Sequence, residues 1–391
     1  MYRLFISLVS ATLLIACQNI SSKLKDAELI SQSVSDQFIP DSREDLYQIH
    51  FKTDGKVLIA FGETTNPEAR HALLSHLKNL TLPIEDSIKL LPDPALGANN
   101  WGLVTISVCN IRTGPAHSAE MSTQAILGTP VKVLKKSGSW LFIQTPDSYL
   151  GWVDDDAIQP MDTTSISAWK KGKRFIYLPL VGAGFDPIKK EAVTDLVAGS
   201  ILKLDTLFKG EALLEMPDGR KLTVPLADGM EFDCWKKQTE ASVFTLSNTA
   251  RSLTGRPYLW GGTSAKGVDC SGFVKTVFFL NGIILARDAS LQFRHGTFID
   301  PQKGYNALKP GDLVFFGRQA KGNKPARATH VGMYLGNGEY INSSGYVKIQ
   351  SFSPDQKNYA KYREGMWLGG RTILGSEESK GIVRVREHPW Y

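Results

Sequence analysis

A cysteine stands between an aspartate and a serine in the stretch VDCSGFV, residues 268–274. The turn-rich string RPYLWGGTSAKG precedes it, and the apolar string FVKTVFFLNGI, long enough for a buried helix, follows it. These neighbours place Cys270 in the first turn of a helix, where the helix dipole and free backbone N–H groups favour a thiolate. Four roles are open to Cys270: small core residue, half of a disulfide, metal ligand or nucleophile.

A candidate base lies downstream, in LKPGDLVFFGRQAKGNKPARATHVGMYLGNGEYINSSG. This string predicts three strands, of which the second contains His330 and the third contains Asn342. Adjacent antiparallel strands can bring His330 and Asn342 side by side, so that the imidazole takes the thiol proton while the amide orients its far nitrogen. A single histidine is more often structural, but the other six in the chain lack such a context.

Together, RPYLWGG…DCSGFV, GDLVFF…THVGMYLG and YINSSG resemble the NlpC-type cell-wall cysteine peptidases, which are papain-like, over about residues 240–374. The resemblance implies that Cys270 is the nucleophile, His330 the base and Asn342 the third member of the triad. A histidine is commoner at the third position, and an amide can orient His330 but carries no charge. Tyr258 matches the family's tyrosine near the oxyanion; the alternative is an aromatic that packs beside Trp260.

The 391 residues are more than one hydrophobic core usually serves, and the 35 Gly and 19 Pro favour β-rich modules. The strings NIRTGPAHSAEMSTQAILGTPVKVL and SWLFIQTPDSYLGWV resemble a bacterial SH3-type barrel. A second, poorer match contains a hairpin signal at Asp218-Gly219. We therefore expect an α+β protein, in which SH3-like β-barrels precede a papain-like peptidase domain.

The expected boundaries run as follows: a signal peptide at 1–17, a tether and small α+β segment at 18–100, barrels at 101–162 and 163–236, the peptidase at 237–375 and a peripheral tail at 376–391. Within the N-terminal segment, the sequence predicts a hairpin around residues 53–55. It also predicts a helix that Asn66 caps and Pro67 opens.

The N-terminus, MYRLFISLVSATLLIAC, has one Arg followed by an apolar run too short to span a bilayer. Ala16 directly before Cys17 resembles a bacterial lipobox, in which Cys17 would become the acylated first residue. An ordinary signal peptide is the alternative. Gln18, rather than an aspartate, favours the periplasmic face of the outer membrane in a cell with two membranes. We expect an exported, membrane-anchored lipoprotein.

The other cysteines and the charge exclude several kinds of site. No CxxC pair and no Cys/His cluster with zinc spacing occurs, so neither a metal nor another cofactor is implied. Cys109 and Cys234, both in apolar, strand-like surroundings, could pair after export or remain free buried thiols. The net charge of +6, without a dense Lys/Arg stripe, suits work near anionic polymers or membranes but predicts no nucleic-acid partner.

The domain order resembles a subgroup that cuts the γ-D-glutamyl bond to a diamino acid in murein peptides. In that subgroup the barrel closes one end of the cleft, and substrates carry a free N-terminal L-Ala. The resemblance implies substrate contacts at Asp269, Ser271, Glu120, Tyr149 and Trp260. As alternatives, Glu120 could be a solvated loop acid and Tyr149 part of the barrel core.

The expected activity is therefore a γ-D-glutamyl–diamino acid endopeptidase of cell-wall recycling. Two other functions remain open. One is a general cell-wall amidase or hydrolase of the same Cys/His chemistry, and the other is a murein-binding module with an inactive peptidase domain. The sequence leaves the oligomeric state open.

Overall fold

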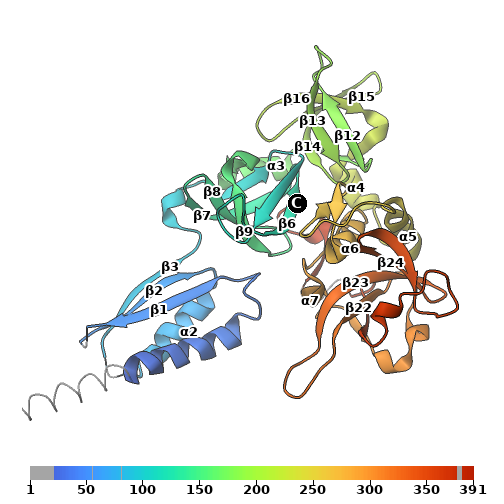
Figure 1. Cartoon of the computed structure of the whole chain (residues 1–391). Coiled ribbons are helices and arrows are strands. Elements are labelled where there is room, and N and C mark those ends of the chain that lie inside the picture. The colour runs from blue at the N-terminus through green and yellow to red at the C-terminus, as the bar shows by residue number, and fades with distance from the viewer. Residues whose placement is uncertain (1–21, 55, 81, 377–380) are drawn as a thin grey trace, which may run out of the picture. The chain divides into compact units, whose positions relative to one another are not determined.

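The computed structural model describes residues 22–54, 56–80, 82–376 and 381–391 (Figure 1). The expected signal peptide and Cys17 lie outside these residues. The chain divides into two compact units, one ending at Gly97 and the other beginning at Ala98. Within the described residues, no helix is both long and apolar enough to cross a membrane.

The first unit is a small α+β structure. Residues 22–38 are helical, so the tether expected to begin at residue 18 is already helix at residue 22. Strands β1 (Tyr47–Thr53) and β2 (Leu58–Thr64) form the predicted hairpin, and β3 (Ile84–Leu90) lies parallel to β2. The crossover between β2 and β3 contains helix α2 (Pro67–Leu77), which Asn66 caps by accepting a bond from the Ala69 N–H, as predicted.

The second unit begins with a seven-stranded sheet, which we call the first β-domain. Its strand order is β10-β4-β7-β8-β9-β5-β6. The bounds are β4 (Trp101–Val104), β5 (Val108–Arg112), β6 (Met121–Ile126), β7 (Pro130–Ser137), β8 (Trp140–Gln144), β9 (Leu150–Asp154) and β10 (Ile158–Met161). Helix α3 (Thr163–Lys171) then leads out of this domain.

The second β-domain also has seven strands, in the order β13-β12-β16-β15-β14-β11-β17. Asp218-Gly219 turns between β15 and β16, as the hairpin signal predicted, and Gly219 has the positive φ of 88° that suits glycine. The bounds are β11 (Arg174–Tyr177), β12 (Val181–Phe185), β13 (Ala192–Val197), β14 (Ile201–Phe208), β15 (Glu211–Glu215), β16 (Lys221–Pro225) and β17 (Gly229–Glu231). Helix α4 (Phe232–Gln238) follows.

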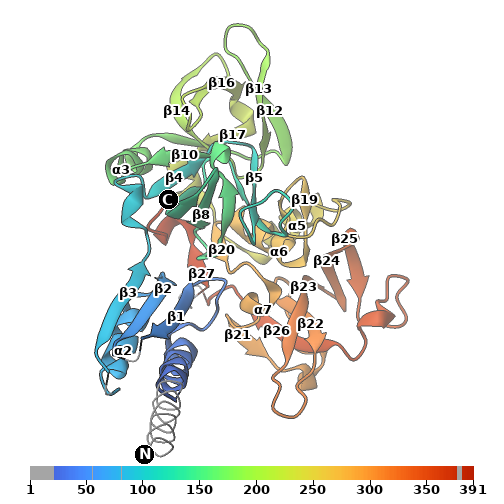
Figure 2. The same ribbon diagram turned by 60° about the vertical axis from the view of Figure 1, so that its left-hand side comes forward.

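The last part of the chain, which we call the peptidase domain, packs helices against a six-stranded antiparallel sheet (Figure 2). The sheet has the order β21-β26-β22-β23-β24-β25. The helices are α5 (Val243–Ser252), α6 (Cys270–Phe279) and α7 (Ala289–Gln292), and the sheet strands are β21 (Thr297–Ile299), β22 (Leu313–Arg318), β23 (Arg327–Gly336), β24 (Glu339–Ser344), β25 (Tyr346–Ser351) and β26 (Trp367–Thr372). Strands β18 (Thr263–Ser264) and β19 (Gly267–Val268) form a small hairpin just before α6.

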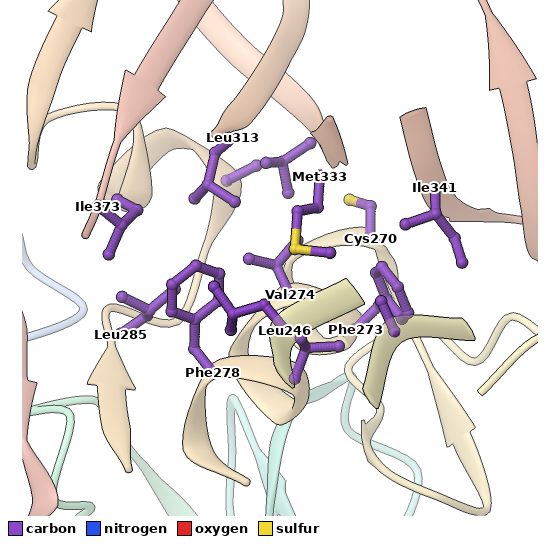
Figure 3. Packing of buried hydrophobic residues seen from close by; sticks show 14 of the residues in the cluster. Leu246, Cys270, Phe273, Val274, Phe278, Leu285, Leu313, Met333, Ile341 and Ile373 are labelled. Carbon is purple, nitrogen blue, oxygen red and sulfur yellow. The ribbon is translucent and has the colours of Figure 1, made fainter. Parts of the chain in front are cut away.

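The core of this domain joins one face of α6 to the central strands. Phe273, Val274 and Phe278 from α6 meet Leu313 on β22 and Met333 on β23 (Figure 3). Burying this apolar surface fixes the helix against the sheet. The first residue of α6 is therefore held at a fixed place beside β23 and β24.

The C-terminal segment is not the peripheral tail that its polar composition predicted. Strand β27 (Ile382–Arg384) pairs with β20 (Ile283–Leu285), and Val385 is buried. The Trp390 ring stands edge-on to Trp101 at 5.1 Å, which ties the segment to the first β-domain. A few apolar and aromatic residues suffice to anchor an otherwise charged segment.

Candidate active site

Cys270 is the first residue of helix α6, as the sequence predicted. Asp269 caps this helix by accepting a bond of 2.7 Å from the Gly272 N–H. The Cys270 side chain is buried in the α6 cluster together with Met333 and Ile341 (Figure 3). The backbone N–H groups of Val331 and Ser271 both donate to its sulfur.

His330 and Asn342 lie side by side, as predicted for neighbouring antiparallel strands. His330 is on β23 and Asn342 on β24, with 2.8 Å between Nε2 of the imidazole and Oδ1 of the amide. Both side chains are buried. Since Nε2 is engaged, Nδ1 is the nitrogen left for Cys270, which contacts Val331, the next residue along β23.

The resting charge state differs from the expected thiolate. Burial raises the pKa of the Cys270 thiol to about 11, with the negative charge of Asp269 adding to the effect, and the N–H groups of Val331 and Ser271 only partly offset it. Burial lowers the pKa of His330 to about 3, and the charge of Arg363 lowers it further. The free site therefore holds a neutral thiol and a neutral imidazole, because desolvation outweighs the helix dipole here.

Tyr258 lies on the loop before α6. Its backbone N–H donates to the Gly345 carbonyl at 2.9 Å, which ties this loop to the end of β24. Burial raises the pKa of the Tyr258 hydroxyl to about 12, and the nearby Cys270 and Asp269 add to the shift. The hydroxyl therefore keeps its proton at neutral pH and can donate a hydrogen bond, which suits the role near the oxyanion that the resemblance implies.

Asp269 and Ser271 take part in a buried network that the sequence did not predict. The Arg287 guanidinium, only 1% exposed, reaches Asp269 Oδ2 at 2.5 Å and Ser271 Oγ at 2.9 Å. Burial alone would raise the pKa of Asp269, but the charge and hydrogen bonds of Arg287 lower it. The Asp269 carboxylate also accepts from the Gly261 and Gly272 N–H groups, so its oxygens are already occupied within the protein.

The first β-domain brings two of the predicted residues to the peptidase domain. Glu120 Oε1 accepts a bond of 2.7 Å from the Trp260 indole, which is 61% exposed on the loop before α6. Tyr149 packs with Ala286 and Leu291 and donates its hydroxyl to Asp288 at 3.0 Å. Both contacts join the two domains, so Tyr149 belongs to their interface rather than to the core of the β-domain.

Sequence reasoning missed Arg287 and Asp288. The signal available was a pair of opposite charges directly after the apolar run GIILA, just before a short helix.

Cys109 is a buried free thiol, and Cys234 is an exposed free thiol on α4 rather than on a strand, so the possible disulfide is absent. Among the described residues, three carboxylates lie close enough together to hold a metal ion: Asp154, Asp155 and Asp156, at the start of a short 3-10 helix.

Family comparisons match two parts of the chain. The NlpC/P60 family matches residues 255–372, and the bacterial dipeptidyl-peptidase Sh3 domain matches residues 111–158. A γ-D-glutamyl-L-lysine dipeptidyl-peptidase of Bacillus cereus is 30% identical over 235 residues, covering 57% of this chain and 67% of that protein. A protein of the same name from Bacillus subtilis is 28% identical over 248 residues, covering 59% and 75%.

A solved structure of an NlpC/P60 family protein from Bacillus cereus superposes with a TM-score of 0.59 at 22% identity, over 70% of this chain and 99% of that chain. At this identity the likeness speaks for the fold alone. The expected fold class, an α+β peptidase domain preceded by SH3-like domains, is confirmed. The chain belongs to the NlpC/P60 family of cell-wall peptidases and is related to the γ-D-glutamyl-L-lysine dipeptidyl-peptidases.

Proposed function

We propose that this peptidase hydrolyses the bond between γ-D-glutamate and a diamino acid in murein peptides that carry a free N-terminal L-Ala. One observation supports this proposal most strongly. An acidic side chain of the first β-domain, Glu120, meets Trp260 on the loop that leads to Cys270. A carboxylate beside an exposed aromatic wall is the environment that a small peptide's ammonium group requires.

In the proposed reaction, His330 Nδ1 takes the Cys270 proton while the sulfur attacks the γ-carbonyl carbon of D-glutamate. In this proposal the Tyr258 hydroxyl donates a hydrogen bond to the oxyanion that forms. The imidazolium then gives its proton to the departing amino group, and the C–N bond breaks. Water, deprotonated by His330, hydrolyses the thioester, releasing L-Ala-D-Glu and restoring the thiol.

The ammonium group of the substrate is assigned to Glu120 and to Asp288 beside Tyr149. The sequence resemblance had placed Asp269 and Ser271 in this group of contacts. Because Arg287 neutralises Asp269, that carboxylate serves better to hold α6 than to bind a cation. Asp288 follows Arg287 directly in the chain and accepts from the Tyr149 hydroxyl, while Arg287 bonds the Asp269 cap of the nucleophile's helix, which supports this assignment.

Product analysis tests the proposal. Mass spectrometry should detect L-Ala-D-Glu and the free diamino acid from L-Ala-γ-D-Glu-L-Lys or from its diaminopimelate counterpart. Intact sacculi should be cut slowly by comparison, in keeping with a recycling role. Efficient release of other fragments from sacculi would indicate a general wall hydrolase, and no thiol-dependent turnover at all would indicate a binding module.

We also propose that the protein is an exported lipoprotein anchored through Cys17. Support comes from the sequence, in which Ala16-Cys17 follows a short apolar run. Metabolic labelling with a fatty acid should mark the wild type but not Cys17→Ala. Two or three acyl chains give stable membrane residence, whereas one gives marginal binding. An unlabelled wild type recovered free of membranes would contradict this localisation.

A further inference from the structure

The Asn342 side chain is held from both sides. Its Oδ1 faces His330, and its Nδ2 donates to Gln350 Oε1 on β25 at 3.1 Å, with a longer contact of 3.4 Å to the Lys348 carbonyl. Gln350 is 7% exposed and Asn342 is fully buried. Gln350 Oε1 also accepts from the Tyr362 hydroxyl at 3.1 Å.

The orientation of this amide matters because it selects the tautomer of His330. When Oδ1 faces Nε2, the imidazole carries its proton on Nε2, and Nδ1 is free to accept the Cys270 proton. When the amide is reversed, an N–H faces Nε2, the ring proton moves to Nδ1, and the base is lost. At neutral pH the imidazole is neutral, so the tautomer decides whether the site can react.

Three further side chains continue the hydrogen-bond network beyond Gln350. Tyr362 lies 3.3 Å from Ser344 Oγ, and Ser344 Oγ lies 3.5 Å from Arg363 Nη2. A guanidinium can only donate, so Ser344 Oγ accepts from Arg363 and has its own proton available for the Tyr362 hydroxyl, which donates to Gln350 Oε1. Gln350 Oε1 accepts from both the Tyr362 hydroxyl and Asn342 Nδ2, which leaves Asn342 Oδ1 facing His330.

We propose that Gln350 is a positioning residue that fixes the orientation of Asn342 and thereby the reactive tautomer of His330. The proposal rests on the catalytic roles proposed above for Cys270 and His330. In the described part of the chain, the hydrogen bonds of the Gln350 side chain go to Asn342 and Tyr362 and to neither of these residues, so Gln350 acts through the Asn342 amide. Its removal should therefore lower kcat and leave KM nearly unchanged.

Two substitutions at position 350 separate this role from simple packing. Gln350→Met keeps the length but removes the acceptor, and kcat should fall about tenfold with KM within about twofold. Gln350→Glu can only accept, so it preserves the direction of the network, and kcat should recover to within about threefold of the wild type. If Gln350 merely packed, the buried charge of the Glu variant would be the worse change. Gln319→Met is the matched control, since Gln319 is exposed and bonds only backbone carbonyls.

A second background gives a non-additivity test. In Asn342→Asp the carboxylate has no N–H group for Gln350 to align. Adding Gln350→Met to this variant should therefore lower kcat by less than about twofold. Nitrogen NMR of His330 gives a direct readout: the wild type should carry its proton on Nε2, and Gln350→Met should show both tautomers. Tyr362→Phe removes the hydroxyl that donates to Gln350 and should lower kcat about threefold. Because Tyr362 is half-exposed, this variant replaces Gln350→Met as the test if the latter does not fold.

Unchanged kcat and an unchanged tautomer in folded Gln350→Met or Tyr362→Phe would overturn the inference while the proposed function stood. A Glu variant slower than the Met variant would also overturn it. Activity retained in Cys270→Ala would instead overturn the proposed function, because that variant removes the attacking sulfur. The two failures are therefore distinguishable.

Discussion

The two β-domains have the same number of strands but contact the peptidase domain in different ways. The first is joined to it by buried polar bonds, including Thr123 Oγ1 to the Arg287 guanidinium and Gln124 to the Thr263 backbone N–H. In the second, Ile176 and Ile201 share a buried apolar cluster with Ile284 of the peptidase domain, and the polar link is the ion pair between Asp195 and Lys266, in which both side chains are about half exposed. The two β-domains therefore have similar folds but make different polar contacts with the peptidase domain.

The difference teaches that the contacts, rather than the fold, indicate which domain shapes the site. Arg287 is bonded at once to Thr123 of the first β-domain and to Asp269, the cap of the nucleophile's helix. Removing one partner of a buried ion pair costs far more than removing one partner of an exposed pair. The first β-domain should therefore influence catalysis, and the second should act as a support.

The largest loss of activity should come from a substitution in the peptidase domain itself. Effects of substitutions in the two β-domains are compared with that loss. Cys270→Ala should lower kcat by at least about a thousandfold, because the attacking sulfur is gone. Cys234→Ser is the matched control, since Cys234 is the exposed free thiol and should be dispensable. Peptide hydrolysis followed by mass spectrometry checks both. Turnover in Cys270→Ala would remove the cysteine-peptidase mechanism.

Arg287→Met tests the buried link directly. The change leaves the Asp269 carboxylate buried without its cation, and should destabilise the second unit by about 3–5 kcal/mol. Lys266→Met breaks the exposed ion pair with Asp195 of the second β-domain and should lower the free energy of unfolding by only about 0–1 kcal/mol. Thermal unfolding of the two variants measures the contrast. Equal losses of stability would contradict the difference between the buried and the exposed polar link.

The pH profile should isolate the contribution of the peptidase domain. Since burial lowers the pKa of His330 to about 3, the imidazole remains an unprotonated base well below pH 6.5, and the acid limb of kcat/KM should lie correspondingly low. Asn342→Asp adds a negative charge beside the ring, raises the pKa of His330 and moves that limb to higher pH. Asp195→Asn should leave the limb in place. An acid limb near pH 6.5 in the wild type would contradict this account.

The sequence predicted the parts of the site that depend on local pattern. The local pattern was enough to predict Cys270 at the start of a helix and His330 beside Asn342 on neighbouring strands, 12 residues apart in the chain. The sequence carries only a weak signal for Arg287 and none for Gln350, because their partners come from other elements and neither residue type predicts burial. The pKa of Cys270 was mispredicted for a related reason. Its desolvation depends on packing by distant strands, whereas the helix dipole is a local property.

The central claim is that the first β-domain recognises the free ammonium group of the substrate. The measurement that tests it most directly compares kcat/KM for L-Ala-γ-D-Glu-diaminopimelate with that for its N-acetylated form. A charged hydrogen bond to Glu120 is worth about 1.5–3 kcal/mol, so acetylation should lower kcat/KM at least about tenfold. Glu120→Gln should shrink this difference, and Asp195→Asn, in the second β-domain, should preserve it. Equal rates on both peptides in the wild type would contradict the claim.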